Sequence, residues 1–293
     1  MEVDAELLSL AARLRLTAPR FSRGQRQGER RGRATGQGQE FADYRPYNPG
    51  DDLRRVDWNA YRRLESLLVR LSHEDRDQRV LLALDATGSM ALAGKADHAA
   101  TITAGLALSG LLARDHVRLG IINHTPTTLT GEDPRALPAM ITALQAATPG
   151  GQADVRALVL AWAAGRRFDR AILLSDLLLP PDEAEGALAA LATVSDRPTL
   201  LHVLSKEDVE PDLSGSLELE DAETGERLLV EGGRGIAEAY REAYARWDKG
   251  LSTLCSRLRI QRIPAPTQLP PAALLSDGLR RAGLVRSQRG ESR

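Results

Sequence analysis

The feature that most constrains the fold is a regular alternation of short apolar runs with longer helical patterns from about residue 79 onward. The run at 79–84 is rich in leucine and valine and has no polar alternation, which is typical of a strand buried on both faces. The pattern that follows it, at 95–114, has the length of a helix. Strands that alternate with helices favour a mostly parallel sheet covered on both faces, so the sequence predicts an α/β fold.

Further strand and helix patterns follow along the chain. A β-hairpin is predicted at 216–231, because alternating side chains flank a central Thr-Gly pair. Further strands are predicted at 67–73, 117–123, 171–175, 199–204 and 259–263, and further helices at 6–16, 134–146, 155–164, 181–194, 236–258 and 270–281. We expect four parts: a helix with an Arg- and Gly-rich arm at 1–35, an aromatic and charged segment at 36–75, the α/β domain at 76–285 with its hairpin at about 214–232, and a tail at 286–293.

The amino-acid composition limits the cellular compartment and the classes of binding partner that we expect. With 42% hydrophobic residues in 293, the chain can bury a sizeable core, and its net charge of -1 points to no particular partner. A single cysteine, Cys255, excludes a disulfide framework within the chain and favours a reducing, cytoplasmic setting. No apolar run approaches the ~20 residues of a membrane span, so no membrane insertion is expected. Residues 13–33 hold eight arginines but only Phe21 for base stacking, which argues against nucleic acid.

The strongest local signal for chemistry lies where a buried strand ends at Asp85. Thr87 and Ser89 follow in a tight turn, and Asp176 follows the predicted strand at 171–175. Because the carboxyl ends of parallel strands meet at one edge of a sheet, these side chains are expected to lie together. Their oxygens suit Mg²⁺, with Mn²⁺ or Ca²⁺ as alternatives. The competing interpretation is a helix cap, since such residues often bind exposed backbone amides.

These residues also carry a family resemblance. The run Asp85-Ala-Thr87-Gly-Ser89 resembles the Asp-x-Ser-x-Ser loop of von Willebrand factor A domains, whose metal-ion-dependent adhesion site uses those side chains. The stretches EFADYRPYNPGDDLRRVDWNAYRR, HEDRDQRVLLALD and DAETGERLLVE resemble the domain-of-unknown-function 58 family, over roughly 36–281. The resemblance implies a von Willebrand factor A-like, Rossmann-like sheet with an N-terminal β-rich extension and a late hairpin.

The same resemblance implies a binding module rather than an enzyme. Members of the family are commonly encoded beside MoxR-type AAA+ ATPases and are thought to act as adaptors in chaperone-like maturation of client proteins. By this resemblance Asp85, Thr87, Ser89 and Asp176 would hold the cation, and a carboxylate from the partner would complete its ligands. A MoxR-type ATPase and its client are therefore the expected partners.

One departure from the family pattern leaves alternatives open. The second metal loop usually offers a Thr just before an Asp, whereas this chain has Ala153 before Asp154. Asp154 could supply a ligand only if the loop shifts. The alternatives are a metal-free scaffold that uses the same face and an aspartyl-phosphate phosphatase with Asp85 as nucleophile. The phosphatase is disfavoured because Thr87 stands where such enzymes carry a second Asp.

The segment at 40–63 concentrates aromatic and charged side chains in a protein with only 4% aromatic residues. One interpretation is an ion-pair network that fixes this segment. The other is a docking surface for a partner ATPase, because Arg and aromatic residues are enriched at binding hot spots. The candidate docking residues are Arg45, Tyr47, Asp51, Asp52, Arg54, Asp57 and Trp58.

Overall fold

The computed structural model describes residues 5–17, 40–46, 60–62, 68–73, 78–222 and 225–287. The chain divides into two compact units, one formed by Arg20–Arg76 and the other by Met1–Pro19 with Asp77–Arg293. Within the smaller unit, β2 (Glu40–Pro46) pairs antiparallel with β3 (Leu68–His73), which confirms the predicted β-rich extension. Residues 18–35 of the predicted arm lie outside the described residues.

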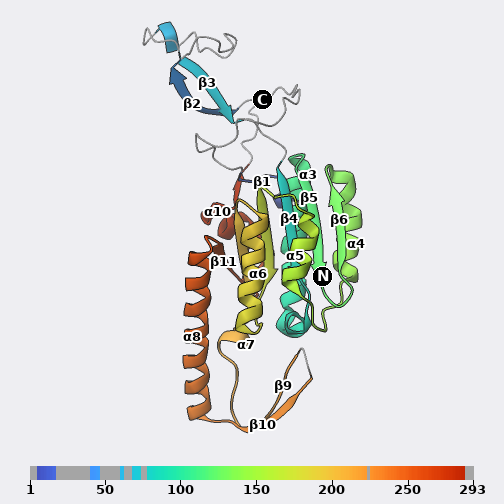
Figure 1. Ribbon diagram of the computed structural model, residues 1–293, viewed down its shortest axis with the longest axis vertical. Coiled ribbons are helices and arrows are strands. Elements are labelled where there is room, and N and C mark those ends of the chain that lie inside the picture. Colours follow the sequence, from blue (N-terminus) through green and yellow to red (C-terminus); the bar gives the residue numbers. More distant parts are fainter. Residues whose placement is uncertain are drawn as a thin grey trace. The chain divides into compact units, whose positions relative to one another are not determined.

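The larger unit is built on a six-stranded sheet in the order β11-β8-β7-β4-β5-β6 (Figure 1). Five strands are parallel, and only the edge strand β6 runs antiparallel to its neighbour β5. This mostly parallel sheet confirms the predicted α/β class. The strands are β4 (Arg79–Asp85), β5 (His116–Ile122), β6 (Thr127–Gly131), β7 (Arg170–Ser175), β8 (Pro198–Leu204) and β11 (Gln261–Pro266).

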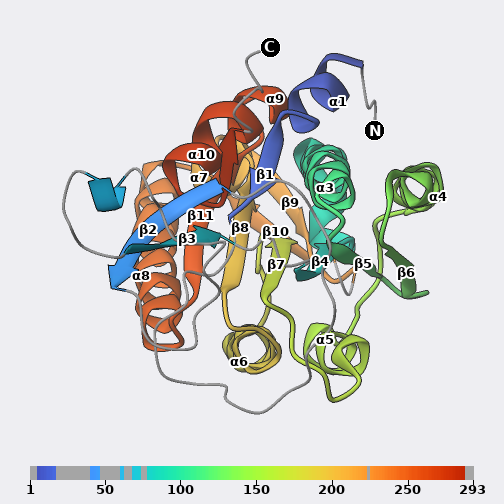
Figure 2. The same cartoon turned by 90° about the horizontal axis from the view of Figure 1, so that it is seen from above.

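Helices cover both faces of this sheet. Successive residues of β4 point to opposite sides: Val80 and Leu82 join the core under α3 and α4, whereas Leu81 and Ala83 join the core under α5 and α6. Figure 2 shows α3 on one side of the sheet and α5 and α6 on the other. The helices are α3 (Lys95–Leu112), α4 (Leu137–Ala146) after the short turn η3 (Pro134–Ala136), α5 (Val155–Ala163), α6 (Pro181–Val194) and α8 (Arg234–Arg257).

A glycine in β5 decides how closely α5 approaches the sheet. A Cβ atom at Gly120 would lie 2.3 Å from the indole ring of Trp162, so any larger residue would force the ring away. Trp162 is 7% exposed and belongs to the core between α5 and the sheet. The absence of a side chain at Gly120 therefore lets this tryptophan pack directly on the strand.

Two predicted elements need correction. The helix predicted at 6–16 ends at Ala11 as α1 (Ala5–Ala11), because β1 (Leu14–Leu16) pairs with β12 (Val285–Ser287), which provides partners for its backbone. The strand predicted at 259–263 begins two residues later as β11, because the Ile260 amide still donates to the Cys255 carbonyl at the end of α8. The edge strand β6 was not predicted. Its run TTLTG exposes most of its side chains.

The predicted hairpin, the long helix and the last helix are confirmed, whereas Arg286 and Ser287 of the predicted tail belong to β12. The hairpin consists of β9 (Ser216–Glu220) and β10 (Arg227–Glu231), paired antiparallel. The final helical stretch contains a π-helical turn, η4 (Leu274–Gly278), between α9 (Pro271–Ala273) and α10 (Leu279–Arg281). Within the described part of the chain, no helix combines the length and apolarity that crossing a membrane requires.

Candidate functional site

Four loops meet at the carboxyl end of the main sheet. The first leaves β4 at Asp85 and continues through the 3-10 turn η2 (Gly88–Gly94) into α3. The second, before α5, is fastened to the first because the Gly150 amide donates to the Ala86 carbonyl (3.0 Å) and the Gly88 amide donates to the Gly151 carbonyl (3.1 Å). The third follows β7, and the fourth leads from β8 into the short helix α7 (Lys206–Val209).

Asp85 lies in the centre of this region and is 1% exposed. Its Oδ1 accepts hydrogen bonds from the Thr87 amide (3.0 Å) and the Thr87 hydroxyl (2.8 Å), and its Oδ2 accepts one from the Ser175 hydroxyl (2.5 Å). Burial, and then the charge of Asp176, raise the pKa of Asp85 to about 6, although these hydrogen bonds oppose the rise. Both carboxylate oxygens of Asp85 are thus held by neighbouring donors.

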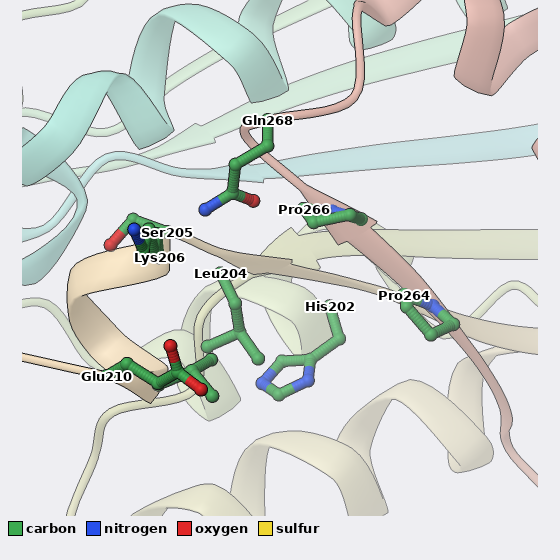
Figure 3. A pocket seen from close by; sticks show the side chains of 9 residues that line it. His202, Leu204, Ser205, Lys206, Glu210, Pro264, Pro266 and Gln268 are labelled. Atoms are coloured by element: carbon green, nitrogen blue, oxygen red, sulfur yellow. The ribbon is translucent and has the colours of Figure 1, made fainter.

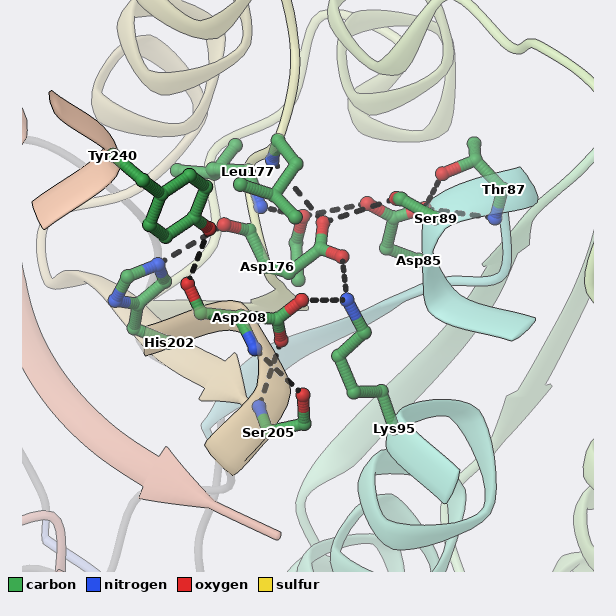
Figure 4. A network of polar contacts seen from close by, with 12 residues as sticks. Asp85, Thr87, Ser89, Lys95, Asp176, Leu177, His202, Ser205, Asp208 and Tyr240 are labelled. Atoms are coloured by element: carbon green, nitrogen blue, oxygen red, sulfur yellow. Dashed lines mark hydrogen bonds and ion pairs between the residues drawn. The ribbon is translucent and has the colours of Figure 1, made fainter. Parts of the chain in front are cut away.

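Asp176 forms the second carboxylate of the site and is also 1% exposed. Its Oδ1 accepts from the Ser89 hydroxyl (3.1 Å) and the Leu178 amide (3.2 Å), and its Oδ2 accepts from the Lys95 ammonium (2.7 Å). The side chains of Asp85, Thr87, Ser89 and Asp176 therefore lie in one region, as the sequence predicts, within the network of Figure 4.

Sequence reasoning missed Lys95, whose side chain has 0% exposure. Its ammonium bonds Asp176 and also Asp208 Oδ1 (3.0 Å). Asp208 belongs to a capping box in α7: its Oδ2 accepts from the Ser205 amide (2.8 Å), and its own amide donates to the Ser205 hydroxyl (3.1 Å). One signal could have revealed this residue. A lysine at the start of an otherwise apolar, buried helix needs a carboxylate partner.

His202 of β8 supports the site from behind. Arg262 donates to its Nδ1 (2.7 Å), so Nε2 carries the proton and donates to the Asp176 carbonyl oxygen (3.0 Å). Burial, and then the positive charge of Arg262, lower the pKa of His202 to about 4. The imidazole is therefore neutral at pH 7. The Tyr240 hydroxyl donates to the Asp208 carbonyl (2.7 Å) and thereby connects the network to α8.

The donors already in place do not fit a divalent cation between Asp85 and Asp176. All four of their carboxylate oxygens accept hydrogen bonds from protein groups, and one donor is the buried Lys95 ammonium. Two like unit charges 4 Å apart repel by about 4 kcal/mol at an effective dielectric constant of about 20, and a divalent ion doubles that repulsion. Among the described residues, no group of three or more His, Cys, Asp or Glu is arranged to hold a metal ion.

The second loop supplies no side-chain oxygen to this cluster. Asp154 caps α5 instead, because its Oδ1 accepts from the Ala157 amide (2.8 Å). Ala153 packs against the core under α5 and α6. Of the candidate docking residues, Arg45 lies in β2. The others lie outside the described residues, namely Tyr47, Asp51, Asp52, Arg54, Asp57 and Trp58.

Two loops of the site contain strained backbone. Ala93 (φ 49°) and Leu177 (φ 50°) adopt the left-handed conformation that side chains disfavour. Such strain collects at functional sites, where the surrounding structure imposes it. Each strained residue adjoins an exposed leucine: Leu92 is 55% exposed and Leu178 is 39% exposed.

Two cavities lie near the network. The larger, about 620 Å³, opens beside Thr87 and is bordered by Asp154, Leu178, Asp182 and Asp221 among others. The smaller, about 230 Å³, lies between β8, β11 and α7, where His202, Leu204, Pro264 and Pro266 line it (Figure 3). The larger cavity adjoins the loop that carries Asp85, Thr87 and Ser89, so it belongs to the candidate site.

Comparison with known proteins confirms the family resemblance that the sequence shows. Residues 43–250 match the family model described as protein of unknown function DUF58. The chain belongs to this family. Three relatives, each an uncharacterized protein, are 30% identical to it over 287 residues, covering 89% of this chain and 87% of each relative. One comes from Mycobacterium bovis and two from strains of Mycobacterium tuberculosis, among them Rv1480.

Solved structures show more remote likenesses. BatB from Bacteroides thetaiotaomicron has 12% identity and a TM-score of 0.36, and an aerotolerance-related membrane protein from Bacteroides fragilis has 14% and 0.41; each match covers 70% of this chain and 98% of the other. The pilus adhesin SpaC from Lactobacillus rhamnosus GG has 11% identity and a TM-score of 0.42, over 72% of this chain and 31% of the adhesin. Identities and scores this low transfer no function to the chain.

Proposed function

We propose that this DUF58 protein is a non-enzymatic protein-binding module, and that its partner binds at the carboxyl end of the main sheet. The observation that carries the proposal is the exposure of Leu92 (55%) and Leu178 (39%) on the loops that hold Ser89 and Asp176. Apolar surface rimmed by polar residues marks many protein interfaces. The buried polar network keeps both loops in place before a partner arrives, which lowers the entropic cost of binding.

The proposed binding surface includes the cavity of about 620 Å³. It is bordered by Thr87 from the first loop, Leu178 from the third and Asp221 from the hairpin. A partner that contacts Leu178 can therefore insert a side chain between the loops. An enzymatic role for Asp85 has less support, because its carboxylate is 1% exposed and both of its oxygens accept hydrogen bonds.

The partner that we propose is a MoxR-type AAA+ ATPase, with the chain acting as an adaptor in chaperone-like maturation of a client. Membership of the DUF58 family supports this choice through the resemblance described above. Of the two forms of the module, Mg²⁺-dependent and metal-free, the ion pairs of Lys95 favour the metal-free form.

The test is a direct binding measurement between the purified chain and a purified MoxR-type ATPase from the same genome, by biolayer interferometry. Leu92→Asp and Leu178→Asp should each weaken binding at least about tenfold, which corresponds to about 1.4 kcal/mol. Leu160→Asp is the matched control, because Leu160 is also 39% exposed but lies in α5 and not on the loops that hold Ser89 and Asp176. Equal affinity for all variants would refute the proposed surface, and absence of binding by the wild type would refute the proposed partner.

A further inference from the structure

We propose that the ammonium of Lys95 is the resident cation of this site and takes the place of the divalent ion expected from the loop of Asp85, Thr87 and Ser89. The assignment of the cation depends only on this chain. Its consequence, that a partner binds without a divalent ion, rests on the proposed function.

A turn of the backbone places the Lys95 side chain in the interior. Ala93 (φ 49°) and Gly94 (φ 71°) are both left-handed, and with them η2 ends and the chain turns into α3. Leu92, before the turn, is exposed, whereas Lys95, after it, is fully buried. A lysine charge removed from water requires compensating charge and hydrogen bonds. Lys95 obtains both from two carboxylates, Asp176 Oδ2 at 2.7 Å and Asp208 Oδ1 at 3.0 Å.

The ammonium joins loops that are distant in sequence, as a bound metal ion would. Lys95 begins α3, Asp176 follows β7, and Asp208 lies in α7. A compact charge with several donors can bridge two carboxylates in this way. The hydroxyl of Tyr240 extends the connection to α8 through the Asp208 carbonyl oxygen.

The hydroxyl groups of the loop are oriented for this arrangement. Thr87 donates its hydroxyl proton to Asp85 (2.8 Å), and Ser89 donates its own to Asp176 (3.1 Å). In a metal site the hydroxyl oxygens would instead offer lone pairs to the cation. Asp176 therefore receives the positive charge of Lys95 and a hydrogen bond from Ser89, and Asp85 receives hydrogen bonds from Thr87, in place of a divalent ion.

The experiment is a Mn²⁺ titration of the full chain, followed by electron paramagnetic resonance and calorimetry, with Mg²⁺ as competitor. The wild type should show no saturable binding. Lys95→Gln should bind one Mn²⁺ at least about tenfold more tightly than the wild type, because the carboxylates lose their ammonium. Adding Asp85→Asn to Lys95→Gln should abolish that binding. Lys206→Gln is the control, since Lys206 is an exposed lysine of α7.

The melting temperature provides a second measurement, which can also be made on a Lys95 variant that is destabilised. Mn²⁺ should raise the melting temperature of Lys95→Gln and of Lys95→Met, because a ligand that binds only the folded state stabilises it. It should leave the wild type unchanged. Two results would overturn the proposal: saturable Mn²⁺ binding by the wild type that Asp85→Asn removes, or no Mn²⁺ effect on the wild type or on either Lys95 variant. No partner enters these measurements, so their failure is distinct from failure of the proposed function.

Discussion

Removing the Lys95 charge should destabilise the protein strongly, and removing the charge of Asp176 as well should restore about half of the loss. Met matches the length of Lys without its charge, so Lys95→Met leaves Asp176 buried, at 1% exposure, without its cation. Breaking a buried pair by removing one partner costs about 3–5 kcal/mol. We expect about 3 kcal/mol, because Asp176 keeps two other donors, Ser89 and the Leu178 amide.

The double variant separates charge compensation from simple packing. Asp176→Asn alone should cost about 1–2 kcal/mol, because Lys95 retains Asp208. Lys95→Met combined with Asp176→Asn should also cost only about 1–2 kcal/mol, so the coupling between the two sites is about 3 kcal/mol. Urea unfolding followed by circular dichroism measures each value. The exposed Lys206→Met control should stay within about 0.5 kcal/mol of the wild type. Additive losses in the double variant would show that Lys95 does not compensate the charge of Asp176.

Three further perturbations test other parts of the structure. Gly120→Val should lower the free energy of unfolding by about 3 kcal/mol or more, because its side chain would overlap Trp162; urea unfolding with no loss would contradict this packing. Asp154→Ala should cost about 1 kcal/mol through the lost α5 cap, and Asp154→Ser should retain most of it, whereas a larger loss in the Ser variant would point to another role. The pKa of His202 is lowered to about 4, below its value of 6.5 in the unfolded chain. As the pH decreases from 6.5 to 4, the unfolded chain therefore binds a proton that the folded protein does not bind, and the free energy of unfolding falls by about 3 kcal/mol. His202→Gln should flatten that decline in unfolding free energy, and an unchanged pH profile would contradict the assignment.

Much of the fold follows from local patterns. The buried strand that ends at Asp85 and the strand before Asp176 show continuous apolar runs, so their parallel pairing and the meeting of their carboxyl ends could be predicted. The strand β1 could not, because Leu14–Leu16 continues a helical spacing and becomes a strand only through its pairing with Val285–Ser287, far away in sequence. The edge strand β6 escaped prediction because its residues lack an apolar face of sufficient length.

The candidate site was predictable in part for the same reason. Asp85, Thr87, Ser89 and Asp176 follow strand ends, and strand ends are visible in the sequence. Lys95 pairs with Asp208, which lies 113 positions away in a helix of only four residues. No local sequence pattern predicts such a contact. Charge compensation between distant segments depends on the completed fold. The sequence therefore indicates the carboxylates at the strand ends, and the lysine at the start of an apolar helix indicates a buried charge, but the pairing between Lys95 and Asp208 depends on the completed fold.

The most direct test of Lys95 as the resident cation is a crystal structure of the wild-type protein grown in the presence of Mn²⁺, with anomalous scattering recorded at the manganese edge. We expect the Lys95 ammonium between Asp176 and Asp208, and no manganese peak within coordination distance of Asp85 or Ser89. A manganese peak bound by Asp85, Thr87 and Ser89, with the Lys95 side chain displaced from Asp176, would contradict this assignment.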